Sequence, residues 1–408
     1  MTSAPVLESE VPSTAAERVE FVSQVNWNSA TELDPPQRGL DAAYVRRYAR
    51  ALEDGGFDYT LVPYFSSSPE SNVLAAVIGA WTERLKTVVA IRPNYTHPLV
   101  AAQKLATLDR LTEGRAVVHL ISGGLDAEQR RHGDYEPKDR RYVRTSEYLD
   151  LLRRAWTATE SFSHEGEFYR FDDFGPGFPT HSGDAIPISI GGQSDAAFEI
   201  GGAKADWFTF NAGESLEQTR IDIDRVNTIA RAAGRPDPRI WVTFRPVLAP
   251  TDAQAWEKAH EYARRLGANA AAFRAALGAP KTIDVKPESA GGQRARAYAD
   301  ASDRYDRALW TGFTRATGGF GPASAGLVGT PETVAAAILD YVDAGASVVS
   351  IKGYDTLNDV VTYGQELLPL VRQELAHRAS TGTRGRLQAE HRGFADPDYA
   401  AAADAAAR

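Results

Sequence analysis

The chain has 408 residues, of which 43% are hydrophobic, and a formal net charge of −9. This length can bury a large core and fits either two ordinary domains or one α/β barrel with insertions. Charges of both signs are interspersed and no basic stripe runs along any segment, so we expect no nucleic-acid partner. The absence of cysteine excludes disulfides, thiolate metal sites and a cysteine nucleophile.

The two ends of the chain differ in composition from its middle. Residues 1–18 are acidic and lack an apolar signal core, which predicts a disordered lead-in. Residues 376–408 are rich in Ala, Arg and Asp without apolar periodicity, which predicts a C-terminal extension. No run approaches the ~18–20 apolar residues of a membrane span. We therefore expect a cytoplasmic protein with no membrane partner.

Between these ends, apolar runs of strand length alternate with amphipathic stretches of helix length. The predicted strands are residues 19–26, 59–63, 87–91, 116–121, 186–190, 207–210, 240–248 and 348–351. The predicted helices are residues 40–55, 71–82, 98–111, 140–156, 194–203, 216–233, 253–266, 330–345 and 357–375. This alternation predicts an α/β fold, a single (β/α)8 TIM barrel over residues 19–375. A six-stranded doubly wound sheet is the alternative, disfavoured because no GxGxxG follows the first strand.

Two insertions interrupt the alternation, at about residues 157–185 and 267–327. The first contains HEGEFYRFDDFGPGFP and is predicted to form a short hairpin and a loop. The second follows strand seven and combines an Ala-rich helical part, a polar stretch at 281–295 and a Gly-rich run at 316–326. An insertion there lies at the catalytic end of a barrel, so we interpret it as a lid, with an inert surface insertion as the alternative.

Barrel active sites are built at the C-terminal ends of the strands. Side chains there are rich in hydroxyls, amides, aromatics and arginine but poor in carboxylates, and include Asn26, Trp27, Ser68, Asn94, His119, Phe210, Arg245 and Tyr354. No histidine pattern indicates a metal, and no paired acids suit glycoside hydrolysis. Lys352, the lysine nearest a strand end, is expected to face a helix. A bound cofactor is therefore expected to supply the reactivity.

The turn from Gly191 to Ser194 predicts a phosphate site. Two glycines let the backbone approach an anion, and a helix that begins at Ser194 directs free N–H groups and its positive dipole end toward it. Ser122 to Gly124 offers a similar turn at the preceding strand end. A Gly-Gly turn after a strand also serves tight packing, but two such turns at consecutive strand ends favour phosphate.

Other candidates have two readings each. His119, on an apolar strand, is either a hydrogen-bonded core residue or an active-site residue. Tyr142 opens an amphipathic helix and could simply pack there. Arg245 lies within the apolar strand TFRPVL, where a charge is costly unless it meets a partner or an anionic ligand, and this favours function.

Several stretches resemble the bacterial-luciferase-like superfamily and, within it, the alkanesulfonate monooxygenase group. They recur in order over roughly residues 40–370: ERLKTVVAIRP, AAQKLATLDRLTEGRAVVHLISGG, DRRYVRTSEYLDLLRRAW, EGEFYRF, GGQSDAAFEIGGAKAD and LVGTPETVAAAI. The resemblance implies a barrel with an insertion after strand seven. It also implies reduced FMN, delivered by a separate NAD(P)H-dependent flavin reductase, which activates O2 as a flavin C4a-peroxide.

The resemblance also implies roles for individual residues. The FMN contacts, mainly to its phosphate, would be Ser122, Gly123, Tyr142, Gly192, Gln193 and Ser194, with His119 and Asn94 along the flavin. Arg245 would hold an anionic substrate group or stabilise charge on the oxygenated flavin, while Tyr354 and Ser68 would donate hydrogen bonds. The substrate pocket would include Asn26, Trp27, Phe210, Val247 and Arg315.

This chain departs from the alkanesulfonate group on the substrate side. Ser68 stands where that group has cysteine, Val247 where it has histidine, and Phe210 where it has tryptophan. The lid arginine aligns with Thr317, so Arg315 is its candidate substitute. We thus expect a homo-oligomeric two-component monooxygenase for a small organic substrate, a sulfonate or sulfone among the candidates. The alternatives are deazaflavin- or FMN-dependent hydride transfer and a non-catalytic flavin-binding protein.

Overall fold

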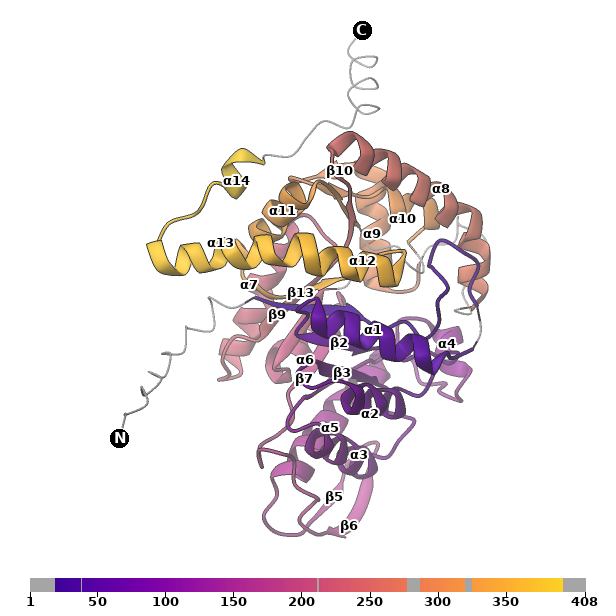
Figure 1. The fold of residues 1–408 in the computed structure, drawn as a ribbon. Coiled ribbons are helices and arrows are strands. Elements are labelled where there is room, and N and C mark those ends of the chain that lie inside the picture. The colour runs from indigo at the N-terminus through magenta and orange to yellow at the C-terminus, as the bar shows by residue number, and fades with distance from the viewer. Residues whose placement is uncertain (1–18, 38, 211–212, 277–286, 320–324, 392–408) are drawn as a thin grey trace, which may run out of the picture.

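The computed structural model describes residues 19–37, 39–210, 213–276, 287–319 and 325–391. Eight parallel strands form its central ring (Figure 1). In ring order they are β1 (Glu20–Gln24), β2 (Tyr59–Val62), β3 (Lys86–Ile91), β4 (Ala116–Leu120), β7 (Ile188–Gly191), β8 (Trp207–Phe210), β9 (Arg239–Leu248) and β13 (Ala346–Ile351). The ring closes because β9 pairs with both β8 and β13, and β13 pairs with β1. The predicted barrel is confirmed, and the doubly wound alternative is wrong because that sheet would be open.

Helices cover the outside of the ring (Figure 1). They include α1 (Ala42–Asp54), α2 (Ser71–Trp81), α3 (Pro98–Leu111), α5 (Lys138–Thr157), α6 (Asp195–Lys204), α7 (Leu216–Ala232) and α11 (Pro331–Asp343). A short helix, α4 (Asp126–Arg130), follows β4, and the long helix α8 (Asp252–Ala276) follows β9. Several begin at a capping side chain, which accepts a hydrogen bond from an otherwise unpaired N–H group of the first turn. Asp41 accepts from the Tyr44 amide at 3.0 Å, and Thr330 accepts from the Thr333 amide at 3.3 Å just before Pro331.

Alternation along the strands decides which side chains enter the barrel. On β8, Phe208 and Phe210 point outward and pack against Phe198 of α6, with ring centroids 5.1 and 6.3 Å away. The neighbouring Thr209 points inward. A small apolar cluster that includes Trp207 and Trp241 fills the interior of the barrel. The barrel is therefore a packed core with a polar upper layer.

The first insertion forms the predicted hairpin. Strands β5 (Phe162–Glu165) and β6 (Arg170–Phe174) pair antiparallel, apart from the barrel sheet. The Tyr169 hydroxyl donates to the Pro93 carbonyl and fastens the hairpin to the loop after β3.

Between β9 and α11 the chain builds a second layer on the C-terminal end of the barrel. Helix α8 runs to Ala276, well beyond its predicted end. It is followed by α9 (Ala290–Ala301), β10 (Arg304–Tyr305), β11 (Leu309–Trp310), α10 (Gly312–Thr317) and β12 (Gly326–Gly329). Strand β12 pairs in parallel with the last residues of β9, so the barrel sheet continues into this layer. The predicted lid movement stays a prediction, and parts of its segment, residues 277–286 and 320–324, lie outside the described residues.

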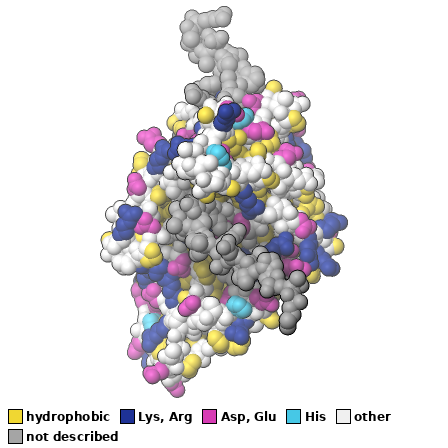
Figure 2. Space-filling view, turned by 60° about the vertical axis from the view of Figure 1, so that its left-hand side comes forward, with side chains coloured by type: hydrophobic (Ala, Val, Ile, Leu, Met, Phe, Trp, Pro, Cys, Tyr) yellow, Lys and Arg dark blue, Asp and Glu magenta, His cyan; other side chains and the backbone are white. Residues whose placement is uncertain are grey.

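The last predicted helix is divided by the structure into α12 (Thr356–Thr362), a π-helical turn η2 (Tyr363–Leu367) and α13 (Leu368–Thr381). A short helix, α14 (Leu387–Glu390), follows. The termini predicted as a lead-in and as most of the extension, residues 1–18 and 392–408, lie outside the described residues. Within the part of the chain that the structure describes, no helix is long and apolar enough to cross a membrane. Figure 2 shows both charge signs interspersed over one face.

Candidate active site

A cavity of about 1290 Å³ opens at the C-terminal end of the barrel. Inward residues of the ring form its floor, the loop after β1 forms one wall, and the end of α8 forms another. The lining includes Gln24, Asn26, Trp27, Glu32, Leu61, Phe65, Ser66, His119, Thr209, Trp241, Thr243, Arg245, Phe273, Ser350 and Lys352. Its volume exceeds the upper range of about 1,000 Å³ for ordinary ligand pockets, so it can hold two molecules side by side.

Three charged side chains meet in the wall of this cavity. Lys352 Nζ lies 2.5 Å from one Glu32 carboxylate oxygen, and Arg245 donates to the other. Burial alone would raise the pKa of Glu32, but the charges of Arg245 and Lys352 lower it to about 2. Burial lowers the pKa of Lys352 against the opposing effect of Glu32, whereas for Arg245 the effect of Glu32 exceeds that of burial and the pKa rises. Lys352 therefore does not face a helix, and that prediction is wrong.

Tyr354 and Val247 lie behind this cluster and do not line the cavity. Both belong to a second apolar core, with Trp256, Trp310 and Phe313, between the barrel and the added layer. The Arg245 guanidinium carbon lies 4.3 Å from the centre of the Tyr354 ring. In this structure Tyr354 supports Arg245 rather than reaching the cavity, contrary to the role implied by resemblance.

His119 does line the cavity, at the end of β4. Its Nδ1 lies 3.0 Å from the Ser189 hydroxyl, which lies 3.0 Å from the Thr209 hydroxyl. Burial lowers the pKa of His119 to about 4, so the imidazole is neutral near neutral pH. A neutral ring held by Ser189 keeps Nε2 available as a single hydrogen-bonding atom.

Other predicted pocket residues are divided between the cavity and the packing around it. Asn26 and Trp27 line the cavity, and Asn26 is fixed by donation to the Ala30 carbonyl at 3.0 Å. Phe210 points away from the cavity and packs on α6, so its predicted place in the pocket is wrong. Thr209, its inward neighbour, lines the wall instead.

Ser68, Arg315 and Asn94 are not among the residues that line the cavity. The Ser68 hydroxyl lies 3.0 Å from the carbonyl oxygens of both Phe65 and Pro69, within its own loop. Arg315 is half exposed on α10, pairs with Asp303 and donates to the Ala299 carbonyl at 2.5 Å. Asn94 is half-buried in the turn after β3. None of the three lines the cavity or the smaller cleft beside it.

The predicted phosphate residues meet in a separate cleft of about 250 Å³ beside the cavity. Ser122, Gly123, Tyr142, Gly192, Gln193 and Ser194 all line it. Cleft and cavity are neighbours because Gly191 pairs with Thr209 across β7 and β8. The two turns predicted from the sequence to form one anion site are thus side by side.

Gly192 shows why this turn needs glycine. Its φ of 147° is one that residues with a side chain rarely adopt. A Cβ atom there would lie 2.7 Å from the Ala197 Cβ and 3.0 Å from the Tyr142 hydroxyl. The bare backbone therefore lets Tyr142 and the start of α6, capped by Ser194, converge on the cleft.

A third glycine turn, which sequence reasoning missed, closes the cleft from the added layer. Ser289, Ala290, Gly291 and Gly292 line it at the start of α9. The Ser289 hydroxyl accepts from the Gly292 amide at 3.1 Å, so a second capped helix start adjoins the same space. The motif SAGG was the available signal, but nothing local in the sequence places it opposite β7.

Gln193 links the cleft to a buried charge cluster. Its side-chain amide donates to Glu214 at 2.6 Å, and Arg294 of α9 donates to Glu214 at 3.0 Å and to Asp222 at 2.5 Å. Burial, reinforced by Asp222 and opposed by Arg294, raises the pKa of Glu214 to about 7. This cluster fastens α9 against the start of α7 and beside the Gly191–Ser194 turn.

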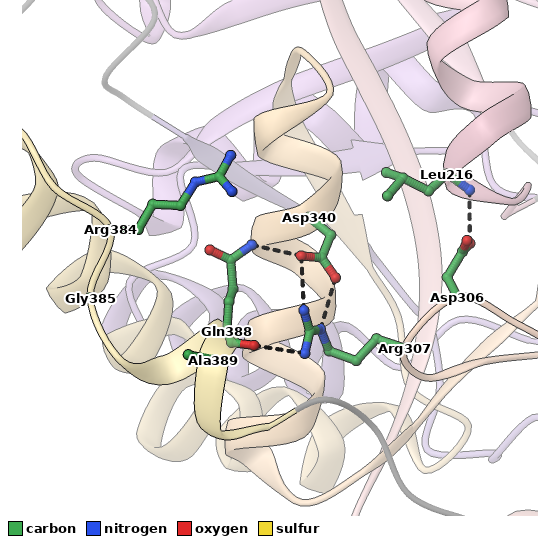
Figure 3. Close-up of a pocket in the computed structure, with 8 residues that line it drawn as sticks. All are labelled: Leu216, Asp306, Arg307, Asp340, Arg384, Gly385, Gln388 and Ala389. Atoms are coloured by element: carbon green, nitrogen blue, oxygen red, sulfur yellow. Dashed lines mark hydrogen bonds and ion pairs between the residues drawn. The ribbon is translucent and has the colours of Figure 1, made fainter.

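A further depression lies on the surface between α11 and α14 (Figure 3). There Arg307 pairs with Asp340 at 2.8 Å and donates to the Gln388 carbonyl at 3.0 Å, while Gln388 donates to Asp340 at 2.6 Å. These groups use one another as partners and hold α14 against α11.

Throughout the described ranges, no group of three His, Asp or Glu side chains could hold a metal ion.

Residues 20–347 match the family model described as luciferase-like monooxygenase. The fold also resembles a solved riboflavin lyase with modified FMN and riboflavin (TM-score 0.71, 18% identity, 93% of this chain and 94% of that one). It is similar to DmoA from Hyphomicrobium sulfonivorans (0.69, 19%, 92% of each chain) and to the EDTA monooxygenase of Chelativorans sp. BNC1 (0.65, 18%, 89% and 94%).

The residues present fit a flavin mononucleotide. A glycine-walled cleft with two capped helix starts suits a phosphate, and the adjoining cavity has room for a flat ring and a second molecule. Because the family model spans most of the chain, the protein belongs to the luciferase-like monooxygenase family of enzymes.

Proposed function

We propose that this protein is the oxygenase component of a two-component monooxygenase that acts on a small organic substrate. A separate NAD(P)H-dependent flavin reductase would supply reduced FMN. One atom of O2 would enter the substrate and the other would leave as water, while reduced FMN is oxidised to FMN. The observation that carries the proposal is the phosphate cleft at Gly192, directly beside a cavity large enough for a flavin ring and a substrate.

Bound reduced FMN would supply the electrons that activate oxygen. The chain's own residues would bind and orient: Ser122, Tyr142 and the Gly192 turn hold the phosphate, and Gln193 keeps the turn in place through Glu214. Neutral His119 lines the cavity with Nδ1 against Ser189, so Nε2 would be the ring atom that serves a bound molecule as donor or acceptor. The second layer, from α8 to β12, would exclude water from the cavity.

An anaerobic titration with FMNH2, followed by flavin absorbance, tests the cofactor half of this proposal. We expect FMNH2 to bind at least ten times more tightly than FMN and aerobic substrate oxidation to require a flavin reductase. Absence of FMNH2 binding by the folded protein would refute the proposal. Analytical ultracentrifugation of the same samples tests the predicted homo-oligomer.

Hydride transfer on the same fold is the second candidate. Its support is the likeness to a tetrahydromethanopterin reductase of Methanopyrus kandleri that depends on coenzyme F420 (TM-score 0.62, 18% identity, 86% of this chain and 99% of that one). The same titration with this deazaflavin separates the two candidates. Tighter binding of the deazaflavin than of FMNH2, without oxygen consumption, would favour hydride transfer.

A further inference from the structure

The cavity wall carries an unequal number of buried charges. Glu32 contributes one negative charge, and Arg245 and Lys352 contribute one positive charge each. Both cations contact the same carboxylate, and both have side chains no more than a tenth exposed. An excess buried cation is costly unless an anion accompanies it.

Hydrogen-bond capacity leads to the same conclusion. A guanidinium has five N–H donors and an ammonium has three, far more than one carboxylate accepts in this geometry. Both cations line the cavity, so a ligand there can take up the donor capacity that Glu32 leaves over.

The rest of the cavity suits an apolar body. Trp27, Leu61, Phe65, Trp241 and Phe273 line it together with the three buried charged groups and with Arg131, which pairs with Glu128 at 3.6 Å. The charged cluster lies at β9, β13 and the loop after β1, whereas the phosphate cleft lies at β4 and β7. A flavin anchored in the cleft would therefore leave the charged side of the cavity to a second molecule.

We propose that Glu32, Arg245 and Lys352 select a substrate with one anionic group, a carboxylate or sulfonate, on an apolar body. Lys352 is the specificity-determining residue, because it supplies the excess positive charge, and Glu32 sets the net charge of the cluster. The inference rests on the proposed function, since it assigns the second molecule of that cavity.

A charge series tests this proposal on the flavin-free protein. Calorimetric titration compares octanoate and 1-octanesulfonate with neutral octanamide. We expect both anions to bind at least tenfold more tightly than octanamide. Lys352→Met should weaken anion binding at least tenfold, Glu32→Gln should strengthen it, and octanamide affinity should change less than about twofold in each variant.

The double variant Glu32→Gln with Lys352→Met restores one net positive charge and should bind octanoate nearly as the native protein does. Lys352→Arg should also retain anion binding. Circular dichroism and thermal unfolding identify a variant that fails to fold, and the double variant then carries the test. Octanamide binding as tight as octanoate binding, or equal losses for both ligands in Lys352→Met, would overturn the proposal.

Reduced flavin can itself carry a negative charge, so FMNH2 titrations of the same variants distinguish the two sources. An effect of Lys352→Met on FMNH2 affinity without an effect on octanoate would assign the charge to the cofactor and overturn the proposal. A protein that binds octanoate with the predicted charge dependence but never binds FMNH2 would retain this inference and lose the proposed function.

Discussion

Single atoms decide the shape of the cleft at Gly192. At Gly192 the missing Cβ permits both the unusual φ and the approach of the Tyr142 hydroxyl. Tyr142 is itself buried, and burial raises its pKa, so it remains a neutral hydroxyl that can donate to an anion. The turn therefore combines backbone freedom with a donor that is fixed in place.

Replacing Gly192 with alanine should weaken FMNH2 binding at least tenfold, because the added Cβ would force apart Tyr142 and α6. Gly234→Ala is the matched control: Gly234 also has a positive φ, 70°, but a Cβ there meets nothing within 4 Å. Both variants should lose roughly 1 kcal/mol of stability to backbone strain. Anaerobic titration measures the affinities, and equal FMNH2 affinity for the two variants would contradict this account.

Where the signal was local, the sequence located residues that the structure brings together. The Gly191–Ser194 and Ser122–Gly124 turns each carry their own glycine pattern, and both line the cleft. Phe210 was misplaced because lying near a strand end says nothing of the inward or outward direction, which alternation along β8 determines. Glu32 was missed because its partner Arg245 is 213 positions away, and no local pattern reports such a pair.

At the scale of elements, helix α9 joins the added layer to the Gly191–Ser194 turn. Arg294 lies between Glu214 and Asp222, and Gln193 contacts the same Glu214. Hydrophobic periodicity predicted the barrel helices well because each has one apolar face against the sheet. It missed β10, β11 and β12, since strands of two residues or with glycine at both ends give no alternating pattern.

The raised pKa of Glu214 predicts a pH dependence of stability. The contribution of protonated Glu214 to stability is fully present below pH 4.5, which is its pKa in the unfolded chain. This contribution is lost as the pH rises toward about 7, its pKa in the folded protein. The free energy of unfolding should therefore fall by roughly 1–3 kcal/mol more in the native protein than in Glu214→Gln between about pH 5 and pH 8. Urea unfolding at each pH measures the difference.

Glu199→Gln, at an exposed position on α6, is the control and should keep the slope of the native protein. A Glu214→Gln profile parallel to that of the native protein would show that Glu214 does not titrate in this range.

At the scale of the whole molecule, two apolar cores have different tasks. The main core lies between the barrel and its helices, and the second core joins the barrel to the layer from α8 to β12. Arg245 stands at their boundary, with its charge in the cavity and its guanidinium against Tyr354 of the second core. The added layer therefore both covers the cavity and supports its charged wall.

Two fully buried phenylalanines, one in each core, allow the roles of the two cores to be tested separately. Phe313, in the second core, lies 4.7 Å from the Tyr354 ring and 4.9 Å from the Trp310 ring, between ring centroids. Phe21, in the main core, belongs to β1 at a position paired with Val349, away from the cavity lining.

Truncation of either phenylalanine to alanine should cost about 3–5 kcal/mol of stability. Only Phe313→Ala should also weaken octanoate binding, by at least fivefold, because Tyr354 would lose the packing that holds it behind Arg245. Chemical denaturation and calorimetry on both variants measure the two effects, and equal octanoate affinities in Phe313→Ala and Phe21→Ala would mean that the second core does not position the charged wall.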